Sequence, residues 1–113
     1  MRLGEMEFDP AAGLVEGPLG RVGLTPRESA LLACLVEASD RAVPREELLE
    51  RAWGWQHVRD IRTKTVDVHV GRLRTKLALA GVDPRTIQTV RSEGYRVRNP
   101  KDADRANAPI RES

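Results

Sequence analysis

The sequence has a single cysteine, few aromatic residues and no long apolar run. Cys34 has no second cysteine to pair with, so no internal disulfide forms, and nothing indicates an oxidising compartment. No apolar stretch approaches the ~20 residues of a membrane-spanning helix, and the first ten residues lack the apolar segment of a secretory signal. These absences predict a cytoplasmic protein. With 4% aromatic and 40% hydrophobic residues, the 113-residue chain can form one small, mostly aliphatic core.

The charged residues are nearly balanced overall but are unevenly distributed. The whole chain has a net charge of +2. Residues 1–58 carry six basic and ten acidic side chains, a net −4, whereas residues 59–98 carry ten basic and four acidic ones, a net +6. Such a local excess is typical of a surface that binds nucleic acid, although a solvated helix face gives the same pattern.

Short strands followed by helices are predicted for the first half of the chain. Residues 1–24 contain brief apolar pieces between glycine and proline turns, which favours a small antiparallel sheet. The stretch TPRE, residues 25–28, has a capping threonine, a proline for the first helical position and a glutamate that completes a capping box. We expect this helix to end near Ser39 and Asp40. A second helix is predicted over residues 45–53, followed by a loop over residues 54–62.

The segment TKTVDVHVGRLRTKL, residues 63–77, fits two different patterns. Its first half alternates polar and apolar residues like a half-buried strand. The apolar residues of the whole segment, however, recur at the spacing of one helix face: Val66, Val70, Leu73 and Leu77.

The helical pattern is favoured because it continues past Gly71, where the alternation stops. The valines lower helix propensity by only tenths of a kcal/mol each, and Gly71 costs about 1 kcal/mol relative to alanine. Four buried aliphatic side chains, at ~1.5–3 kcal/mol each, outweigh that cost. We therefore predict a helix over residues 63–80, stopped by Gly81, with Val68 pointing away from the core.

The outer face of this predicted helix is suited to a DNA major groove. Lys64, Gly71, Arg72 and Thr75 lie on it beside Val68, with Thr65, Arg74 and Lys76 at its margins. Arginine bonds to guanine edges or to phosphates, threonine bonds to either, and a valine can contact a thymine methyl group. Further along, residues 87–90 and 95–97 are predicted strands, joined by a turn over residues 91–94 in which Gly94 takes a positive φ.

Three motifs in this order and spacing resemble the OmpR/PhoB-type winged-helix DNA-binding domain of two-component response regulators. They are WG at residues 53–54, TVDVHVGRLRTKL at 65–77 and QTVRSEGYRV at 88–97. The resemblance implies an α+β winged helix-turn-helix fold: an N-terminal four-stranded antiparallel sheet, three helices and a C-terminal β-hairpin wing. The domain would cover residues 1–98, and the polar tail over 99–113 is expected to be disordered.

The resemblance also implies which residues contact double-stranded DNA. Base or nearby backbone contacts are expected from Lys64, Thr65, Asp67, Val68 and Arg72. Phosphate contacts are expected from Trp53, His69 and Arg74. Apart from the resemblance, Lys76 at the margin of the helix face is expected to strengthen binding to all DNA sequences alike. In the wing, Arg91 would enter the minor groove, with Thr89 and Tyr95 close to the backbone. The expected partners are direct-repeat sites bound by two copies in tandem, and RNA polymerase through residues 54–62.

The sequence departs from the family pattern at two points. Gly71 replaces a residue that is often basic, so one phosphate contact is missing. The chain also lacks a phosphoacceptor aspartate with an acidic pocket, so the receiver domain expected of a response regulator is absent. This leaves either an excised effector domain or one that stands alone.

Several alternatives stay open at the level of sequence. Trp53 could cover the core, and Arg74 could pair with Asp67 on the helix surface. A winged helix can also serve as a protein-interaction module, although such a module would not need the arginine-rich outer face. We expect no enzyme, cofactor or metal site, because the acidic residues are spread over separate helix faces and the two histidines and one cysteine lie far apart.

Overall fold

A computed structural model describes residues 1–55 and 63–99 of the chain. The first 23 residues form an antiparallel sheet of four short strands, in the order β1 (Arg2–Leu3), β2 (Met6–Asp9), β3 (Leu14–Gly17) and β4 (Gly20–Gly23). Phe8 pairs with Val15 and Val15 with Val22 across the sheet. Met6, Phe8 and Val15 are buried, while the alternate side chains of β2 are exposed. The predicted sheet is therefore confirmed.

Helix α1 (Pro26–Glu37) begins at the predicted capping box. The Thr25 hydroxyl accepts from the Glu28 amide at 3.2 Å, and the Glu28 carboxylate accepts from the Thr25 amide at 2.9 Å. The helix ends slightly before the predicted position, with Ala38 as its cap. Ser39 and Asp40 then take positive φ values of 55° and 73°, and a right-handed α-helix cannot continue through such residues.

The predicted second helix is present, but its winding changes halfway. It starts as α2 (Arg45–Leu48) and continues as a wider π-helical segment, η1 (Leu49–Trp53). Gly54, with φ at 75°, ends it. The sequence pattern does not distinguish the two windings, and the buried residues Leu48 and Leu49 lie on either side of the change.

Helix α3 (Lys64–Leu79) confirms the helical interpretation of the segment with two patterns. Val66, Val70, Leu73 and Leu77 are fully buried on one face, whereas 51% of Val68 is exposed. A strand would have buried Val68 together with Val66 and Val70. Gly81, with φ at 82°, follows the helix as predicted.

The C-terminal hairpin consists of β5 (Ile87–Val90) and β6 (Gly94–Val97), preceded by a 3₁₀ turn, η3 (Pro84–Thr86), that was not predicted. Gly94 has φ at 138°, and a Cβ atom there would collide with the carbonyl oxygen of Val43. Val43 and Tyr95 exchange backbone hydrogen bonds of 2.7 and 3.1 Å, which attach the base of the hairpin to the segment before α2. Ser92 in the turn also takes a positive φ, 66°.

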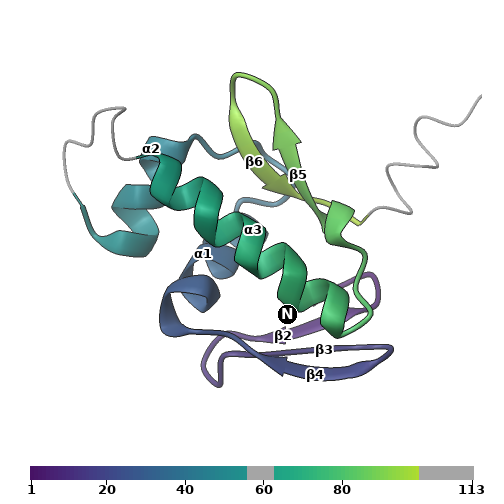
Figure 1. Cartoon of the computed structure of the whole chain (residues 1–113). Coiled ribbons are helices and arrows are strands. Elements are labelled where there is room, and N and C mark those ends of the chain that lie inside the picture. The colour runs from purple at the N-terminus through teal and green to yellow at the C-terminus, as the bar shows by residue number, and fades with distance from the viewer. Residues whose placement is uncertain (56–62, 100–113) are drawn as a thin grey trace, which may run out of the picture.

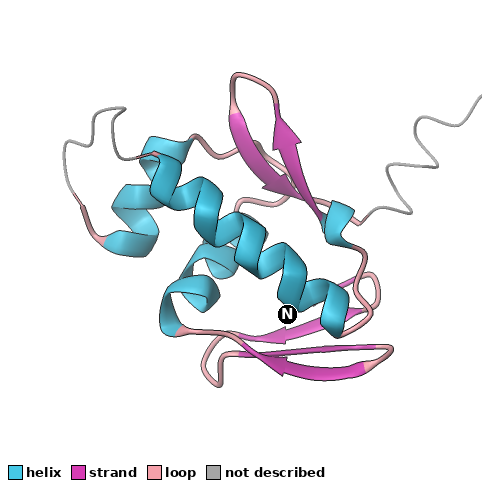
Figure 2. Cartoon of the chain, in the orientation of Figure 1, coloured by secondary structure: helices cyan, strands magenta, loops and turns pink. Residues whose placement is uncertain are grey.

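The arrangement confirms the predicted α+β winged fold. Figure 1 shows α3 running between the N-terminal sheet and the β5–β6 hairpin, with α1 and α2 behind it. Figure 2 shows the same two layers of strands on either side of the helices. One mostly aliphatic core joins them, and Cys34 is buried in it. Burial raises the pKa of its thiol, as expected for a packing residue. No described helix is long and apolar enough to cross a bilayer.

Candidate nucleic-acid interface

The outer face of α3 is formed by residues that the core does not use. Lys64, Val68, Gly71, Arg72 and Thr75 are all exposed. The Thr75 hydroxyl donates to the Gly71 carbonyl of its own helix at 3.1 Å. Arg72 forms no hydrogen bond or ion pair with any residue that the structure describes. The Arg72 guanidinium is therefore available to a ligand. Thr65, which is half-buried, lies at the edge of the same face.

The tip of the hairpin presents a second free cation. Arg91 follows β5 directly and is exposed, and no described residue bonds to its guanidinium. Thr89, two residues earlier, is also exposed. In Figure 1 the hairpin rises beside α3, so the two basic projections belong to neighbouring elements.

Trp53 and His69 lie together at one edge of α3. Their rings meet edge to face, with centroids 5.0 Å apart, and the Arg27 guanidinium lies 5.2 Å from the centroid of the Trp53 ring. Both side chains are half-buried. Trp53 packs against the core, which agrees with the alternative that it covers the core. The His69 Nδ1 atom donates to the Thr65 carbonyl at 2.8 Å, because a carbonyl oxygen can only accept.

The side chains of Asp67 and Tyr95 have partners within the protein. The Tyr95 hydroxyl donates to Asp67 Oδ1 at 2.5 Å, and Arg45 Nε donates to the same oxygen at 2.7 Å. Burial alone would raise the pKa of Asp67, but the hydrogen bonds from Tyr95 and Arg45 outweigh it and lower the pKa. Burial, and then the bond to Asp67, raise the pKa of Tyr95. Only 4% of Tyr95 is exposed, so its ring packs in the core, and its expected place close to the DNA backbone stays a prediction.

Arg74 does not pair with Asp67, contrary to one of the alternatives. Its Nε and Nη2 atoms donate to the Ile87 carbonyl at 3.1 and 2.7 Å, and Nη2 also donates to the Thr89 hydroxyl at 3.0 Å. The expected phosphate contacts of Arg74 and Thr89 stay predictions. What the structure adds is that both side chains already join α3 to β5.

Lys76 is likewise engaged inside the protein. Its ammonium donates to Glu28 Oε1 at 2.6 Å, and the Glu28 side chain is only 3% exposed. The same oxygen accepts the Thr25 amide of the capping box. Lys76 therefore ties α3 to the start of α1, a role that its place at the margin of the outer face did not reveal.

The sequence alone does not show that Asp67 and Lys76 have charged partners within the protein. Arg45 and Glu28 were not singled out as partners, and no local signal identifies them. Arg45 is 22 residues from Asp67, and Glu28 is 48 residues from Lys76. Only the tertiary arrangement brings each pair together.

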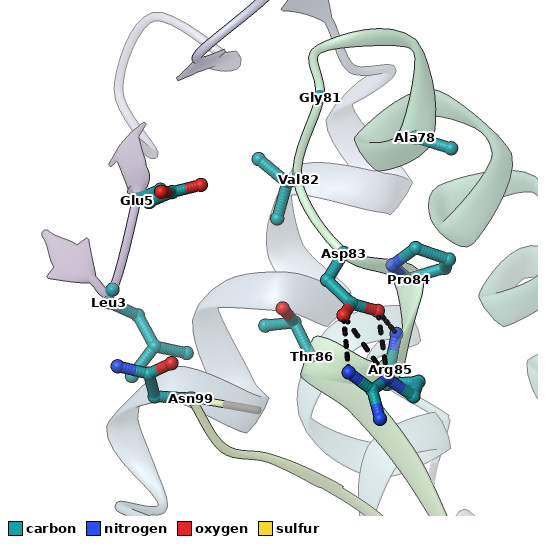
Figure 3. A pocket seen from close by; sticks show the side chains of 11 residues that line it. Leu3, Glu5, Ala78, Gly81, Val82, Asp83, Pro84, Arg85, Thr86 and Asn99 are labelled. Carbon is teal, nitrogen blue, oxygen red and sulfur yellow. Dashed lines mark hydrogen bonds and ion pairs between the residues drawn. The ribbon is translucent and has the colours of Figure 1, made fainter. Parts of the chain in front are cut away.

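An open cavity of about 760 Å³ lies away from these groups. Figure 3 shows it between Leu3 and Glu5 on one side and the segment from Val82 to Thr86 on the other, with Asp83 paired to Arg85. Its lining includes neither the residues of the outer face nor Arg91. Within residues 1–55 and 63–99, no three His, Cys, Asp or Glu side chains are grouped as metal ligands would be. The expected contact of residues 54–62 with RNA polymerase, and the expected disorder of the tail, fall largely outside the described residues.

Comparison with known proteins gives a consistent result. The family model described as "Transcriptional regulatory protein, C terminal" matches residues 20–97. The DNA-binding response regulator MtrA of Mycolicibacterium smegmatis is 36% identical over 100 residues, which are 88% of this chain and 43% of that protein. The phosphate regulon regulatory protein PhoB of Rhizobium meliloti is 39% identical over 95 residues, 84% of this chain and 40% of that protein. The chain thus spans less than half the length of these relatives.

A solved structure also matches most of the chain. The DNA-binding domain of the response regulator AdeR, solved in complex with an intercistronic region, superimposes with a TM-score of 0.71 at 27% identity. The match covers 88% of this chain and all of that domain.

Proposed function

Because the chain belongs to the family of OmpR/PhoB-type C-terminal DNA-binding domains of transcriptional regulatory proteins, we propose that it reads double-stranded DNA with two elements at once. Helix α3 enters the major groove, and the β5–β6 hairpin, the wing, enters the adjacent minor groove. The observation that carries the proposal is the pair of exposed guanidinium groups, Arg72 on α3 and Arg91 on the wing, neither of which has a partner among the described residues. The family is one of transcription factor domains, not of enzymes.

In this proposal the side chains divide into readers and anchors. Arg72, Lys64, Thr65 and Val68 contact base edges or the nearby backbone, since they lie on or beside the exposed face of α3. Trp53 and His69 contact phosphates from the edge of that face. The positively charged half of the chain supplies the attraction for DNA that does not depend on sequence.

The proposal extends to the partners of the whole protein. Two copies occupy direct repeats in tandem, in the cytoplasm, and residues 54–62 contact RNA polymerase. The relatives named as response regulators support a place in two-component signalling, with a receiver domain elsewhere in the full-length protein.

Binding to duplex DNA at several salt concentrations tests the proposal. Each neutralised phosphate contributes about −0.9 to the slope of log affinity against log salt concentration. We expect a steep negative slope, and removal of the wing cation by Arg91→Ala should weaken binding most on sites with a narrow, A/T-rich minor groove beside the major-groove contact. A flat salt response would instead support the second candidate, a winged helix that binds proteins.

The reader role of Arg72 has its own test. Arg72→Ala should cost about 1–3 kcal/mol of binding free energy and relax the preference at one base pair. Selection of sites from a random duplex library by the parent and the variant measures that preference directly. An unchanged selected site would show that Arg72 does not read a base.

A further inference from the structure

Two side-chain hydrogen bonds attach the wing to α3, and both involve the same cross-strand residue pair of the hairpin. Thr89 on β5 and Tyr95 on β6 are direct cross-strand partners. Thr89 accepts a hydrogen bond from Arg74, and Tyr95 donates one to Asp67. Both strands of the hairpin are therefore bonded to side chains of α3, one residue pair before the turn that carries Arg91.

The two attachment points lie far enough apart on α3 to fix an angle. Asp67 and Arg74 are seven residues apart, which is about two turns and roughly 10 Å along the helix axis, on nearly the same side. The backbone bonds between Val43 and Tyr95 already hold the base of the hairpin. Two side-chain contacts at that separation further define the direction of the hairpin strands relative to the helix. Arg74 strengthens its own contact with two further bonds to the Ile87 carbonyl.

Charge and burial at Tyr95 support this role. The guanidinium groups of Arg45 and Arg74 lie 5.0 and 5.7 Å from the centroid of its ring. A carboxylate beside a DNA-binding face repels phosphates, but Arg45 neutralises Asp67 from α2 at 2.7 Å. Asp67 thereby joins three elements: α2, α3 and the wing.

From this geometry we propose that Asp67 and Tyr95 are positioning residues that set the placement of the wing against α3. Without contacting a base, they determine whether Arg91 reaches the minor groove while Arg72 occupies the major groove. The inference rests on the proposed function, because it concerns how two DNA-reading elements act together. It gives Asp67 a part in specificity that differs from the base or nearby backbone contact implied by the resemblance.

A double-mutant cycle between Tyr95 and Arg91 tests the inference. Tyr95→Phe removes one oxygen atom and leaves the ring in the core. The probe is a duplex obtained by selection with the parent domain from a random library, with an A/T-rich flank. We expect the loss of affinity caused by Arg91→Ala to be smaller in the Tyr95→Phe background, by about threefold or more. A displaced wing no longer brings Arg91 to the minor groove, so the two substitutions are energetically coupled.

A second double-mutant cycle, between Asp67 and Arg91, tests the same inference without relying on Tyr95→Phe alone. Asp67→Asn keeps an oxygen that can accept the Tyr95 hydroxyl, whereas Asp67→Ala does not. Asp67→Asn should therefore retain more of the Arg91 effect than Asp67→Ala. The matched control is Glu28→Gln, which weakens the capping box far along the chain from the wing and should leave the Arg91 effect unchanged. All titrations are made well below the melting temperature of each variant.

The outcomes separate this inference from the proposed function. If Arg91→Ala costs the parent no affinity, the wing does not enter the minor groove, and both the proposed wing contact and this inference are refuted. If Arg91→Ala costs the parent affinity and costs Tyr95→Phe and Asp67→Ala the same factor, only this inference is refuted. A reduced factor in both variants, with the full factor in Glu28→Gln, supports it.

Discussion

Removal of the Lys76 side chain should damage the fold and not DNA binding. In the structure the ammonium donates to Glu28 Oε1 at 2.6 Å, and only 3% of the Glu28 side chain is exposed. Lys76→Ala leaves a buried carboxylate with the Thr25 amide as its remaining donor to that oxygen. The partner groups lie in α3 and at the first turn of α1, so their separation loosens the contact between two helices of the core.

The magnitude follows from the burial of the two groups. A hydrogen bond to a charged group contributes about 1.5–3 kcal/mol to stability, and loss of one partner of a fully buried ion pair costs about 3–5 kcal/mol. The Lys76 side chain is 29% exposed, so water can replace part of the lost interaction. We therefore expect a loss near the lower range, about 2 kcal/mol, which corresponds to a fall in melting temperature on the order of 10 °C for a domain of this size.

Thermal and urea unfolding of Lys76→Ala, beside Arg72→Ala as the control, measure this effect. Arg72 has no partner among the described residues, so its removal should change stability by no more than about 0.5 kcal/mol. The loss from Lys76→Ala should also shrink in a Glu28→Gln background, where no carboxylate is left without its cation. A melting curve identical to that of the parent would refute the reasoning. If the slope of log DNA affinity against log salt concentration is less steep by about 0.9 in Lys76→Ala than in the parent, Lys76 neutralises a phosphate.

Three further predictions follow from the same structure. Gly71→Ala should raise stability by roughly 0.5–1 kcal/mol in thermal melts, because nothing lies within 4 Å of the added carbon, while affinity for DNA stays equal or falls. Val68→Ser should barely change stability, since the side chain is half exposed, but should weaken binding to sites with thymine at the contacted position; a loss of about 2 kcal/mol or more would contradict its outward position. Acid should destabilise the domain through Glu28: burial alone would raise its pKa, but Lys76 and Thr25 hold it below the ordinary value. A lowered pKa in the folded state gives stability that is present above about pH 4.3 and is lost as the pH falls further, so urea midpoints should decline there in the parent and less steeply in Glu28→Gln.

The elements could be predicted from sequence because each has a local physical signature. The capping box at Thr25 and Glu28 is four residues long, and the buried face of α3 repeats within one helix. Gly94 could be placed in the wing turn by its conformational freedom, although the reason it must be glycine, the nearby Val43 carbonyl, lies in another segment. The change of winding at Leu49 was not predictable, because no residue type in this segment marks a π-helical turn.

The candidate site was predictable only as far as periodicity extends. Periodicity places a side chain on a face of its helix, and it placed Arg72 and Val68 outside correctly. It does not show which element covers the margins of that face. Asp67 and Lys76 both lie at such margins, and there the neighbouring element decides whether a charge meets solvent or a protein partner. In this fold the wing and α2 cover Asp67, and the start of α1 covers Lys76. In sequence, the charged residues that join these elements thus resemble the ones proposed to contact DNA. Two observations that sequence lacks separate them: how much of the side chain is exposed, and whether its charge is already bound.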